Sequence, residues 1–329
     1  MEFDFAGVEG KKVLISGGAG FIGSNLTKRL VDLKAEVSIF VLPDENLERV
    51  ENIKDKIKII SGDSTKEEDV NGAIDGKDYL FHFAWQTDLK QSMTNPRADV
   101  ENDLIGLINI LECCRKNNPE IKIVFASTVT VVGLTNEMPA NEEIRENPLS
   151  VYEIHKLAAE KYFYVYNKIH GLKTCVLRLS NVFGEGQRID NPGRGVLNFM
   201  VGRALRGEEL TVYGAGNFIR DYNYVQNYID AFILAALSDK TNGEVYVLGS
   251  GEGKTFNEVV EKIKKIVESL TDKKVVITHV PFPGEENEIN KRNFIADSDK
   301  FQAATGWEPK VGFGEGLGRT VKFYLNKNE

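Results

Sequence analysis

The chain has 329 residues, 42% of them hydrophobic, which is enough for two ordinary domains or one enlarged α/β unit. Its formal net charge of −8 disfavours a general affinity for nucleic acid or for an anionic membrane. No apolar run approaches the ~20 residues that span a bilayer, and the acidic stretch Met1–Asp4 does not resemble the basic start of a signal peptide. Three cysteines (Cys113, Cys114 and Cys175) cannot form an even disulfide framework, and no Cys/His pair has zinc spacing. We therefore expect a cytoplasmic protein without a bound metal.

A glycine-rich segment near the amino terminus organises the chain. The apolar run Val13–Ile15 predicts a buried parallel strand, glycines follow at positions 17, 18, 20 and 23, and a helical pattern begins at Ile22. Gly17 and Gly20 would let the backbone turn tightly and approach a pyrophosphate, and Gly23 would let the helix pack close to the strand. The free N–H groups of that helix would then face the phosphates. A tight turn without a ligand is the alternative, and the strand–turn–helix context disfavours it.

Strands and helices alternate through the first half of the chain, which predicts a doubly wound parallel sheet of the α/β class. The expected strands are residues 13–15, 37–41, 56–60, 78–84, 121–126 and 174–179. The expected helices are residues 22–33, 69–74, 99–116 and 150–170, followed by amphipathic helices at 257–269 and 316–324. Beyond residue 184 glycine, proline and asparagine cluster and the strands become short. We expect one domain at 1–184, to which residues 218–238 return, and a smaller lobe at 185–329.

Tyr152 and Lys156 are the residues that most clearly indicate chemistry. Four residues apart on a helix, they lie on one face, and a lysine cation favours the phenolate of a tyrosine whose ordinary pKa is near ~10. The tyrosine could then take or give a proton near neutrality. A solvated helix face is the usual meaning of this spacing. However, the pair follows Ser127 and Thr128 at the carboxyl end of a strand, where open α/β sheets bind ligands. A hydroxyl there could share a substrate oxygen with Tyr152 or could simply cap the turn.

Several motifs occur in the order seen in extended short-chain dehydrogenases/reductases. They are Gly17–Gly23, Gly62–Asp63, His82–Ala84, Tyr152–Lys156, Arg178–Gly184, Gly214–Gly216 with Arg220–Tyr222, Tyr246–Gly251 and Thr305–Pro309. Over nearly its whole length the chain resembles the NAD-dependent nucleotide-sugar epimerase/dehydratase branch of that family, of the UDP-glucose 4-epimerase kind. The resemblance implies a Rossmann domain that binds NAD and a carboxyl-terminal lobe that binds a nucleoside-diphosphate sugar. It also implies a homodimer formed through the helices near residues 101–116 and 152–169.

The resemblance implies roles for individual residues. Tyr152 would be the acid/base, Lys156 its helper and ribose ligand, and Thr128 the third catalytic residue. The residues expected to contact NAD are Gly17, Gly20, Phe21, Ile22, Asp44, Asp63, Ser64, Phe83, Ala84, Ser127, Tyr152, Lys156 and Leu179. The residues expected to contact the sugar nucleotide are Thr128, Asn181, Arg220 and Arg292, with Trp85 a further candidate because it directly follows the fourth strand. Tyr152 would take the proton of a sugar hydroxyl, usually at C4, while hydride passes to the nicotinamide.

The residues after Thr128 bear on the branch of the family. Related dehydratases and decarboxylases carry acidic residues one or two positions further on, whereas this chain has Val129 and Thr130, which cannot act as carboxylate bases. This favours 4-epimerisation, in which hydride returns to the other face of a 4-keto sugar. The alternative is a nucleotide-sugar 4-dehydrogenase or 4-ketosugar reductase on the same scaffold. A non-catalytic dinucleotide-binding protein is disfavoured because Thr128, Tyr152 and Lys156 are retained.

Other departures concern the cofactor and the substrate. Relatives often carry an acid at the tip of the second strand, where this chain has Val41, which leaves Asp44 or Glu45 in the following loop for the ribose hydroxyls. The absence of an arginine at that tip favours NAD over NADP. Asp103 aligns with a family asparagine, Val132 with a tyrosine, and Phe282 with an arginine that Arg292 would replace.

Overall fold

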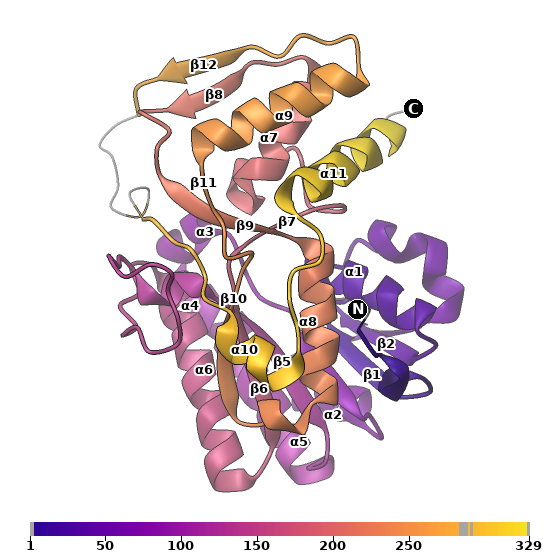
Figure 1. Ribbon diagram of the computed structural model, residues 1–329. Helices are drawn as coiled ribbons and strands as arrows, with labels where there is room; N and C mark the ends of the chain where they lie inside the picture. Colours follow the sequence, from indigo (N-terminus) through magenta and orange to yellow (C-terminus); the bar gives the residue numbers. More distant parts are fainter. Residues whose placement is uncertain (1–2, 283–288, 290–291, 328–329) are drawn as a thin grey trace.

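A seven-stranded parallel sheet forms the base of the molecule in the computed structural model, which describes residues 3–282, 289 and 292–327 (Figure 1). Its strand order is β10-β6-β5-β4-β1-β2-β3. The strands are β1 (Lys12–Ser16), β2 (Glu36–Val41), β3 (Lys58–Ser61), β4 (Tyr79–His82), β5 (Lys122–Thr128), β6 (Lys173–Leu179) and β10 (Glu244–Leu248). The order reverses between β1 and β4, and open sheets of this kind bind ligands at the carboxyl ends of the strands at such a point.

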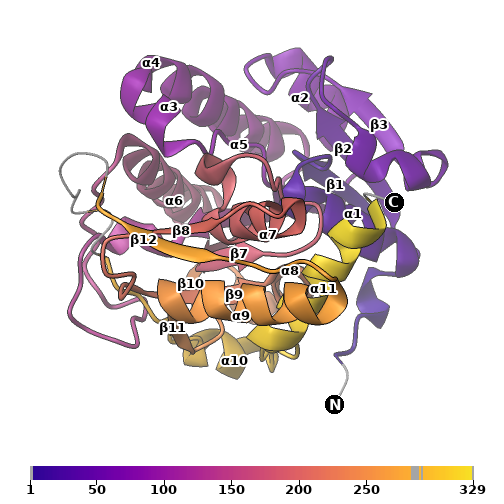
Figure 2. The ribbon, with the colours of Figure 1, turned by 90° about the horizontal axis from the view of Figure 1, so that it is seen from above.

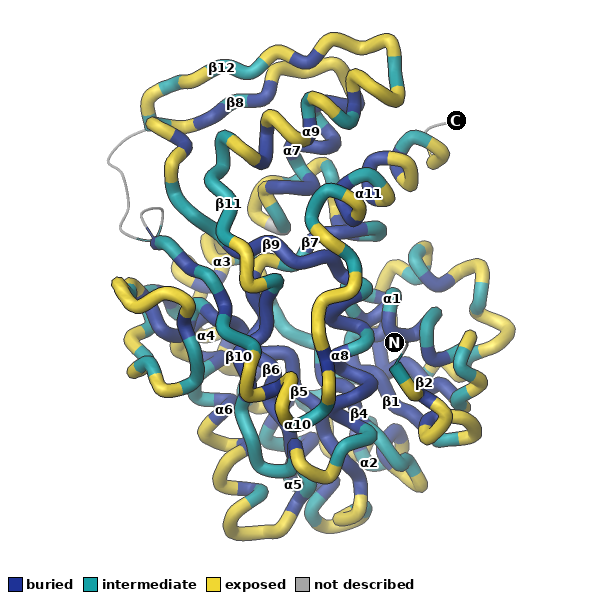
Figure 3. Tube along the Cα trace, in the orientation of Figure 1, coloured by how far each residue is buried: buried dark blue, intermediate teal, exposed yellow. Residues whose placement is uncertain are grey.

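Helices cover both faces of this sheet because alternate strand residues point to opposite sides. On one face Ile15, Phe81 and Val124 share a core with α1 (Phe21–Asp32) and α8 (Val225–Leu237). On the other face Leu80 and Phe125 share a core with α2 (Glu67–Ile74), α5 (Gly106–Asn117) and α6 (Val151–His170). Figure 3 shows the central strands β1, β4, β5 and β6 as mostly buried, as expected for a parallel sheet covered on both faces, whereas the edge strand β3 is largely exposed.

A smaller set of elements lies above the carboxyl edge of the large sheet (Figures 1 and 2). Strands β7 (Asn181–Phe183), β9 (Ile219–Tyr224) and β11 (Gly253–Thr255) form a three-stranded sheet, and β8 (Leu210–Tyr213) pairs with β12 (Ile277–Val280). The helices of this part are α7 (Val196–Arg206), α9 (Phe256–Leu270) and α11 (Phe313–Lys327). Their apolar residues join the same core cluster as α1 and α8, so the two parts pack as one body.

The α/β class and the doubly wound parallel sheet are confirmed, although the bounds of individual elements differ from those expected. Residues 48–56 form a 3-10 helix, so β3 begins at Lys58 rather than at residue 56. The helix expected at 99–116 is divided into α4 (Pro96–Asp99), a π-helical turn η3 (Val100–Ile105) and α5. The return to the large sheet also extends beyond residues 218–238, because the short strand β10 pairs in parallel with β6. In the described part of the chain, none of the helices is both long and apolar enough to cross a membrane.

Candidate active site

The loop between β1 and α1 has the shape of a phosphate cradle. Gly17 has a φ of +69°, and a Cβ there would stand 2.8 Å from the backbone nitrogen of Ala84. A Cβ on Gly23 would stand 2.2 Å from the carbonyl oxygen of Gly17, so only glycine permits this approach of α1 to the loop. Gly20 caps the amino terminus of α1 and has no side chain to bond the first N–H groups, and the first turn carries no acidic residue. The first-turn N–H groups and the helix dipole are therefore available to an anion, and the residues present fit a dinucleotide.

The two acids expected near the adenosine follow neighbouring strands. Asp44 is exposed in the loop after β2, and Asp63 follows β3 at the same edge of the sheet. One carboxylate oxygen of Asp63 accepts hydrogen bonds from the backbone N–H (2.9 Å) and hydroxyl (2.8 Å) of Thr65. The Ser64 hydroxyl lies against α5, since a Cβ on Gly106 would come within 2.4 Å of it. Asp44 and Asp63 thus lie beyond the carboxyl ends of the neighbouring strands β2 and β3. The Ser64 side chain packs against α5 instead.

Three residues expected to contact the cofactor direct their side chains into the core. The Phe83 ring meets Phe232 of α8 at 4.7 Å between centroids, and Leu179 is buried in the same cluster. The Ser127 hydroxyl donates to the buried carboxylate of Glu160 on α6. For Ser127 and Leu179 mainly the backbone remains for a cofactor at the strand ends, whereas the Phe83 ring is only partly buried. The physical reason is strand alternation: Ser127 and Thr128 are consecutive residues of β5, so their side chains point to opposite faces.

Helix α6 carries the acid/base pair. It begins at Val151 because the Ser150 hydroxyl accepts from the Glu153 N–H (3.2 Å), while the Glu153 carboxylate accepts from the Leu149 N–H (2.7 Å). The Lys156 amine lies 5.9 Å from the centroid of the Tyr152 ring and donates to the carbonyl oxygen of Ala126 in β5 (2.7 Å). The helix therefore holds the amine between the phenol and the end of the central strand.

The electrostatics of the pair follow from burial. Burial raises the pKa of the Tyr152 phenol well above its ordinary value, and the negative charges of Glu153 and Asp103 act in the same direction. Burial lowers the pKa of the Lys156 amine, while Asp103 and Glu160 oppose that shift. Without a neighbouring cation the phenol would therefore remain protonated near neutral pH and could not accept a proton.

The remaining predicted catalytic residue, Thr128, ends β5 and forms the cap of a short 3-10 helix, η4 (Val129–Val132). Its hydroxyl accepts from the Thr130 N–H (3.2 Å) and lies 2.9 Å from the Thr130 hydroxyl. The Thr128 hydroxyl therefore caps the turn, which was one of the two roles expected for it. This cap does not exclude a contact with substrate, because one hydroxyl has two acceptor sites and a donor.

Two arginines approach one another from the upper part of the molecule. Burial and the neighbouring charge of Arg292 lower the pKa of the half-buried Arg220 on β9. Arg292 is buried and donates to the Glu153 carboxylate (2.9 Å), and its Nε has no hydrogen-bond partner among the described residues. A buried and a half-buried guanidinium of like charge favour a bound anion such as a diphosphate. Asn181, on the exposed side of β7, donates to the Asp221 carbonyl oxygen (3.1 Å).

The position aligned with the family arginine has a different use. The ring of Phe282 stacks on that of Tyr213 at 6.0 Å between centroids, which joins the segment after β12 to the end of β8. The Trp85 indole, expected in the sugar pocket, lies on the Lys156 amine at 4.1 Å and packs against Phe125 at 5.3 Å. Trp85 thus contacts the catalytic helix directly.

Sequence reasoning missed the buried ion pair behind this site. Arg178 of β6 donates to both carboxylate oxygens of Glu160 at 2.7–3.1 Å, and both side chains are almost fully buried. A signal was available, because Tyr152, Lys156 and Glu160 follow one another at four-residue intervals on one face of α6. The pair fixes the third turn of α6, on the face that carries the catalytic residues.

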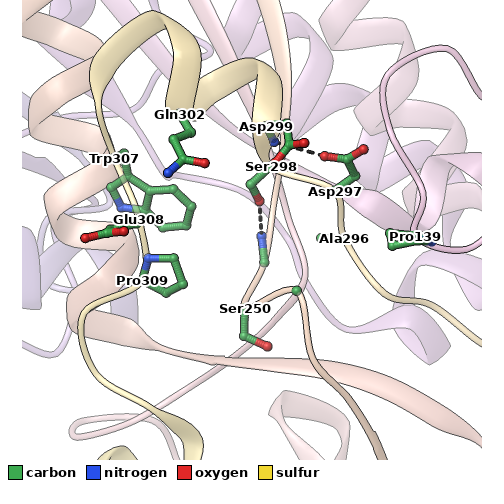
Figure 4. A pocket seen from close by; sticks show the side chains of 12 residues that line it. Pro139, Ser250, Ala296, Asp297, Ser298, Asp299, Gln302, Trp307, Glu308 and Pro309 are labelled. Atoms are coloured by element: carbon green, nitrogen blue, oxygen red, sulfur yellow. Dashed lines mark hydrogen bonds between the residues drawn. The ribbon is translucent and has the colours of Figure 1, made fainter.

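A separate cavity of about 310 Å³ lies beside the segment that follows β10 (Figure 4). Its charged lining is acidic, from Asp297, Asp299 and Glu308, and Figure 4 shows the Ser298 hydroxyl accepting from the Gly249 N–H (3.1 Å). Neither Tyr152 nor the two arginines line it. Its negative charge disfavours a bound diphosphate, in contrast to the region around Arg220 and Arg292.

Comparison with known proteins identifies the family. Residues 14–320 match the family model described as GDP-mannose 4,6 dehydratase. The chain belongs to this family of extended short-chain dehydrogenases/reductases. The resemblance drawn from the sequence motifs is therefore confirmed.

Solved structures agree with this assignment. The UDP-glucose 4-epimerase of Thermotoga maritima, solved with UDP-glucose, is 31% identical with a TM-score of 0.86, covering 97% of this chain and 100% of that one. The UDP-glucose 4-epimerase of Thermus thermophilus, solved with NAD, is 32% identical with a TM-score of 0.83, covering 95% and 99%. A UDP-glucose 4-epimerase of Mycolicibacterium smegmatis is 28% identical over 325 residues, which cover 97% of this chain and 100% of that protein.

Proposed function

We propose that this protein is an NAD-dependent nucleotide-sugar 4-epimerase. The observation that carries the proposal is the α6 pair, Tyr152 and Lys156, held against the end of β5 beside a glycine cradle that fits a dinucleotide. The residues after Thr128 supply no carboxylate: Val129 is buried and Thr130 bonds to Thr128. Proton transfers beyond C4, which dehydration needs, therefore lack a base at this position. Epimerases that match over the full chain length support the same conclusion.

Each part of the molecule has a task in this reaction. The α1 amino terminus and the loop at Gly17 hold the pyrophosphate of NAD, and residues 1–184 with the later return segments form most of that site. When bound, NAD supplies a reversible hydride acceptor, so C4 can be inverted without net oxidation. Residues 185–329 bind mainly the nucleotide sugar, whose diphosphate would pair with Arg220 and Arg292.

The protein's own groups manage the proton. The Lys156 cation stabilises the Tyr152 phenolate, which takes the proton of the C4 hydroxyl; the resulting neutral phenol later returns that proton. Thr128 orients the same hydroxyl through a hydrogen bond. The Lys156 amine is buried, which strengthens the effect of its charge on the partly buried phenol.

The test is a panel of UDP, GDP, CDP and dTDP sugars incubated with the protein and NAD, with products resolved by NMR and reduced cofactor followed by absorbance. We expect a C4 epimer without accumulation of reduced cofactor. Tyr152→Phe should lower turnover by about 10²–10⁴-fold. Tyr164→Phe, an exposed tyrosine on the same helix, is the matched control and should not. Stoichiometric reduced cofactor would indicate the dehydrogenase or reductase alternative, and unchanged turnover in Tyr152→Phe would refute the acid/base role.

We also propose a homodimer that works in the cytoplasm. Apolar side chains on one face of α6 are exposed, including Ile154, Val165 and Ile169 (72% exposed), and Ile105 of η3 adds to them. An apolar helix face of this size usually marks an interface. The three buried cysteines are free thiols, as a reducing compartment would keep them. Light scattering should show a dimer that Ile169→Glu weakens.

A further inference from the structure

The Lys156 amine is held mainly by aromatic faces. The lysine is 3% exposed, and its ammonium lies 4.1 Å from the Trp85 ring centroid and 4.5 Å from that of Phe125. It donates a hydrogen bond to the Ala126 carbonyl oxygen, at 2.7 Å. A buried ammonium has lost its water, and ring faces are the groups left to stabilise its charge. Among aromatic side chains, tryptophan does this best.

Two buried acids fasten the segment that carries Trp85. The Gln86 N–H donates to the Asp103 carboxylate (3.0 Å), and the Gln86 amide donates to Asp99 (3.3 Å). Asp103 lies in the π-helical turn η3 and Asp99 at the end of α4. The backbone next to the indole is thus tied to the two helical segments that precede α5. This fixes the ring independently of any ligand.

The orientation of the indole indicates that its face is the functional part. The Trp85 Nε1 atom is buried and has no hydrogen-bond partner in the described residues. A buried tryptophan usually pairs this N–H, and leaving it unpaired carries an energetic penalty. The ring is therefore placed for its contacts with Lys156 and Phe125 rather than for its N–H.

We propose that Trp85 is a positioning residue that holds the Lys156 ammonium by its ring face at the place where the cation acts on Tyr152. The titratable groups that face the amine are Asp103 from η3, Tyr152 and Glu160 from α6, and His82 from β4. Glu160 is already paired with Arg178, and burial lowers the pKa of His82 to about 3, so His82 is neutral. Asp103 is therefore the carboxylate that remains to support the cation, together with the Ala126 carbonyl oxygen and the ring faces of Trp85 and Phe125. The role in turnover rests on the proposed acid/base function, whereas the contact itself does not.

The contact can be tested without substrate or cofactor. The chain has two tryptophans, so Trp307→Phe leaves Trp85 as the sole tryptophan. We expect its fluorescence in the apoprotein to change with pH as the amine loses its proton, and we expect Lys156→Met in the same background to abolish that transition. Identical titration curves with and without Lys156 would overturn the proposal, even if the epimerase activity is found.

The role is tested in the holoenzyme by pH profiles of kcat. In Trp85→Leu we expect the limb that reports Tyr152 ionisation to move up by about one pH unit, with a smaller shift in Trp85→Phe, because a weaker face supports the cation less. Trp307→Phe is the matched control: it removes a buried hydrogen bond to the Asn227 carbonyl oxygen (2.9 Å) far from the amine and should leave the limb in place. Equal loss of kcat at every pH in Trp85→Leu, without a shift, would show a structural role and refute the positioning role. If the wild type turns over no nucleotide sugar, the proposed function fails and the fluorescence titration alone decides the contact.

Discussion

Gly23→Ala tests whether the close approach of α1 to the β1 loop determines cofactor binding. A Cβ on Gly23 would lie 2.2 Å from the Gly17 carbonyl oxygen and 2.9 Å from the Gly18 Cα. These are backbone atoms, which cannot rotate away as a side chain can. Ordinary contact begins near 3.4 Å, so α1 or the loop must move by about 1 Å.

The size of the effect follows from that displacement. Overpacking of this kind costs about 1–3 kcal/mol. The movement separates the first-turn N–H groups of α1 from the place where a pyrophosphate would bind, so much of the penalty should appear in cofactor affinity. Since each 1.4 kcal/mol is tenfold in affinity, we expect NAD to bind about 10- to 100-fold more weakly.

The assay is calorimetric titration of the apoprotein with NAD, together with thermal unfolding. Gly72→Ala in α2 and Gly318→Ala in α11 are matched controls, because a Cβ at either position meets no atom within 4 Å. Both should stabilise the fold by about 0.4–1 kcal/mol and leave NAD affinity unchanged. Wild-type affinity in Gly23→Ala would show that the clash relaxes elsewhere and that this glycine does not set the shape of the cradle.

Two further predictions concern stability. Arg178→Met leaves the buried carboxylate of Glu160 with the Ser127 hydroxyl but without its cation. This should lower the free energy of unfolding in urea by about 3–5 kcal/mol. The control Lys173→Met breaks an exposed ion pair and should lower it by less than about 1 kcal/mol. Burial raises the pKa of the Asp230 carboxyl to about 6, whereas its pKa in the unfolded chain is near ~4. Between these two pH values the native state binds more protons than the unfolded state, so the free energy of unfolding decreases as pH rises through this window. Asp230→Asn should therefore raise the thermal midpoint at neutral pH but not near pH ~4, and equal midpoints at neutral pH would contradict this.

Local signals account for what could be predicted from the sequence. The strand, glycines and helix of residues 12–32 are contiguous, so spacing alone identifies the cradle. The start of α6 is equally local, because the capping residues Ser150 and Glu153 lie within one turn of Tyr152. Short strands such as β10 carry too few residues for a clear pattern, and β10 is recognisable only once β6 provides its partner.

Contacts between distant segments could not be predicted. Spacing places Ser127 beside Thr128, but it does not show which of them faces Glu160. Trp85 and Lys156 are separated by some seventy residues, and their contact depends on how the end of β4 lies against α6. Such contacts depend on the packing of whole elements, which no local pattern encodes.

The placement of partners along α6 explains why this helix can carry the acid/base chemistry. Its active face is held at successive turns from different directions: Arg292 of the carboxyl-terminal part binds Glu153, the Trp85 indole covers Lys156, and Arg178 of β6 binds Glu160. Because Glu153 adjoins Tyr152 and contributes to its raised pKa, the Arg292 partner also acts on the phenol through that carboxylate. A diphosphate that draws Arg292 away from Glu153 would leave more negative charge beside the phenol and raise its pKa further, opposing ionisation. The Lys156 cation must outweigh this effect when substrate is bound, and that requirement gives a physical reason for fixing the amine with groups that are independent of the substrate.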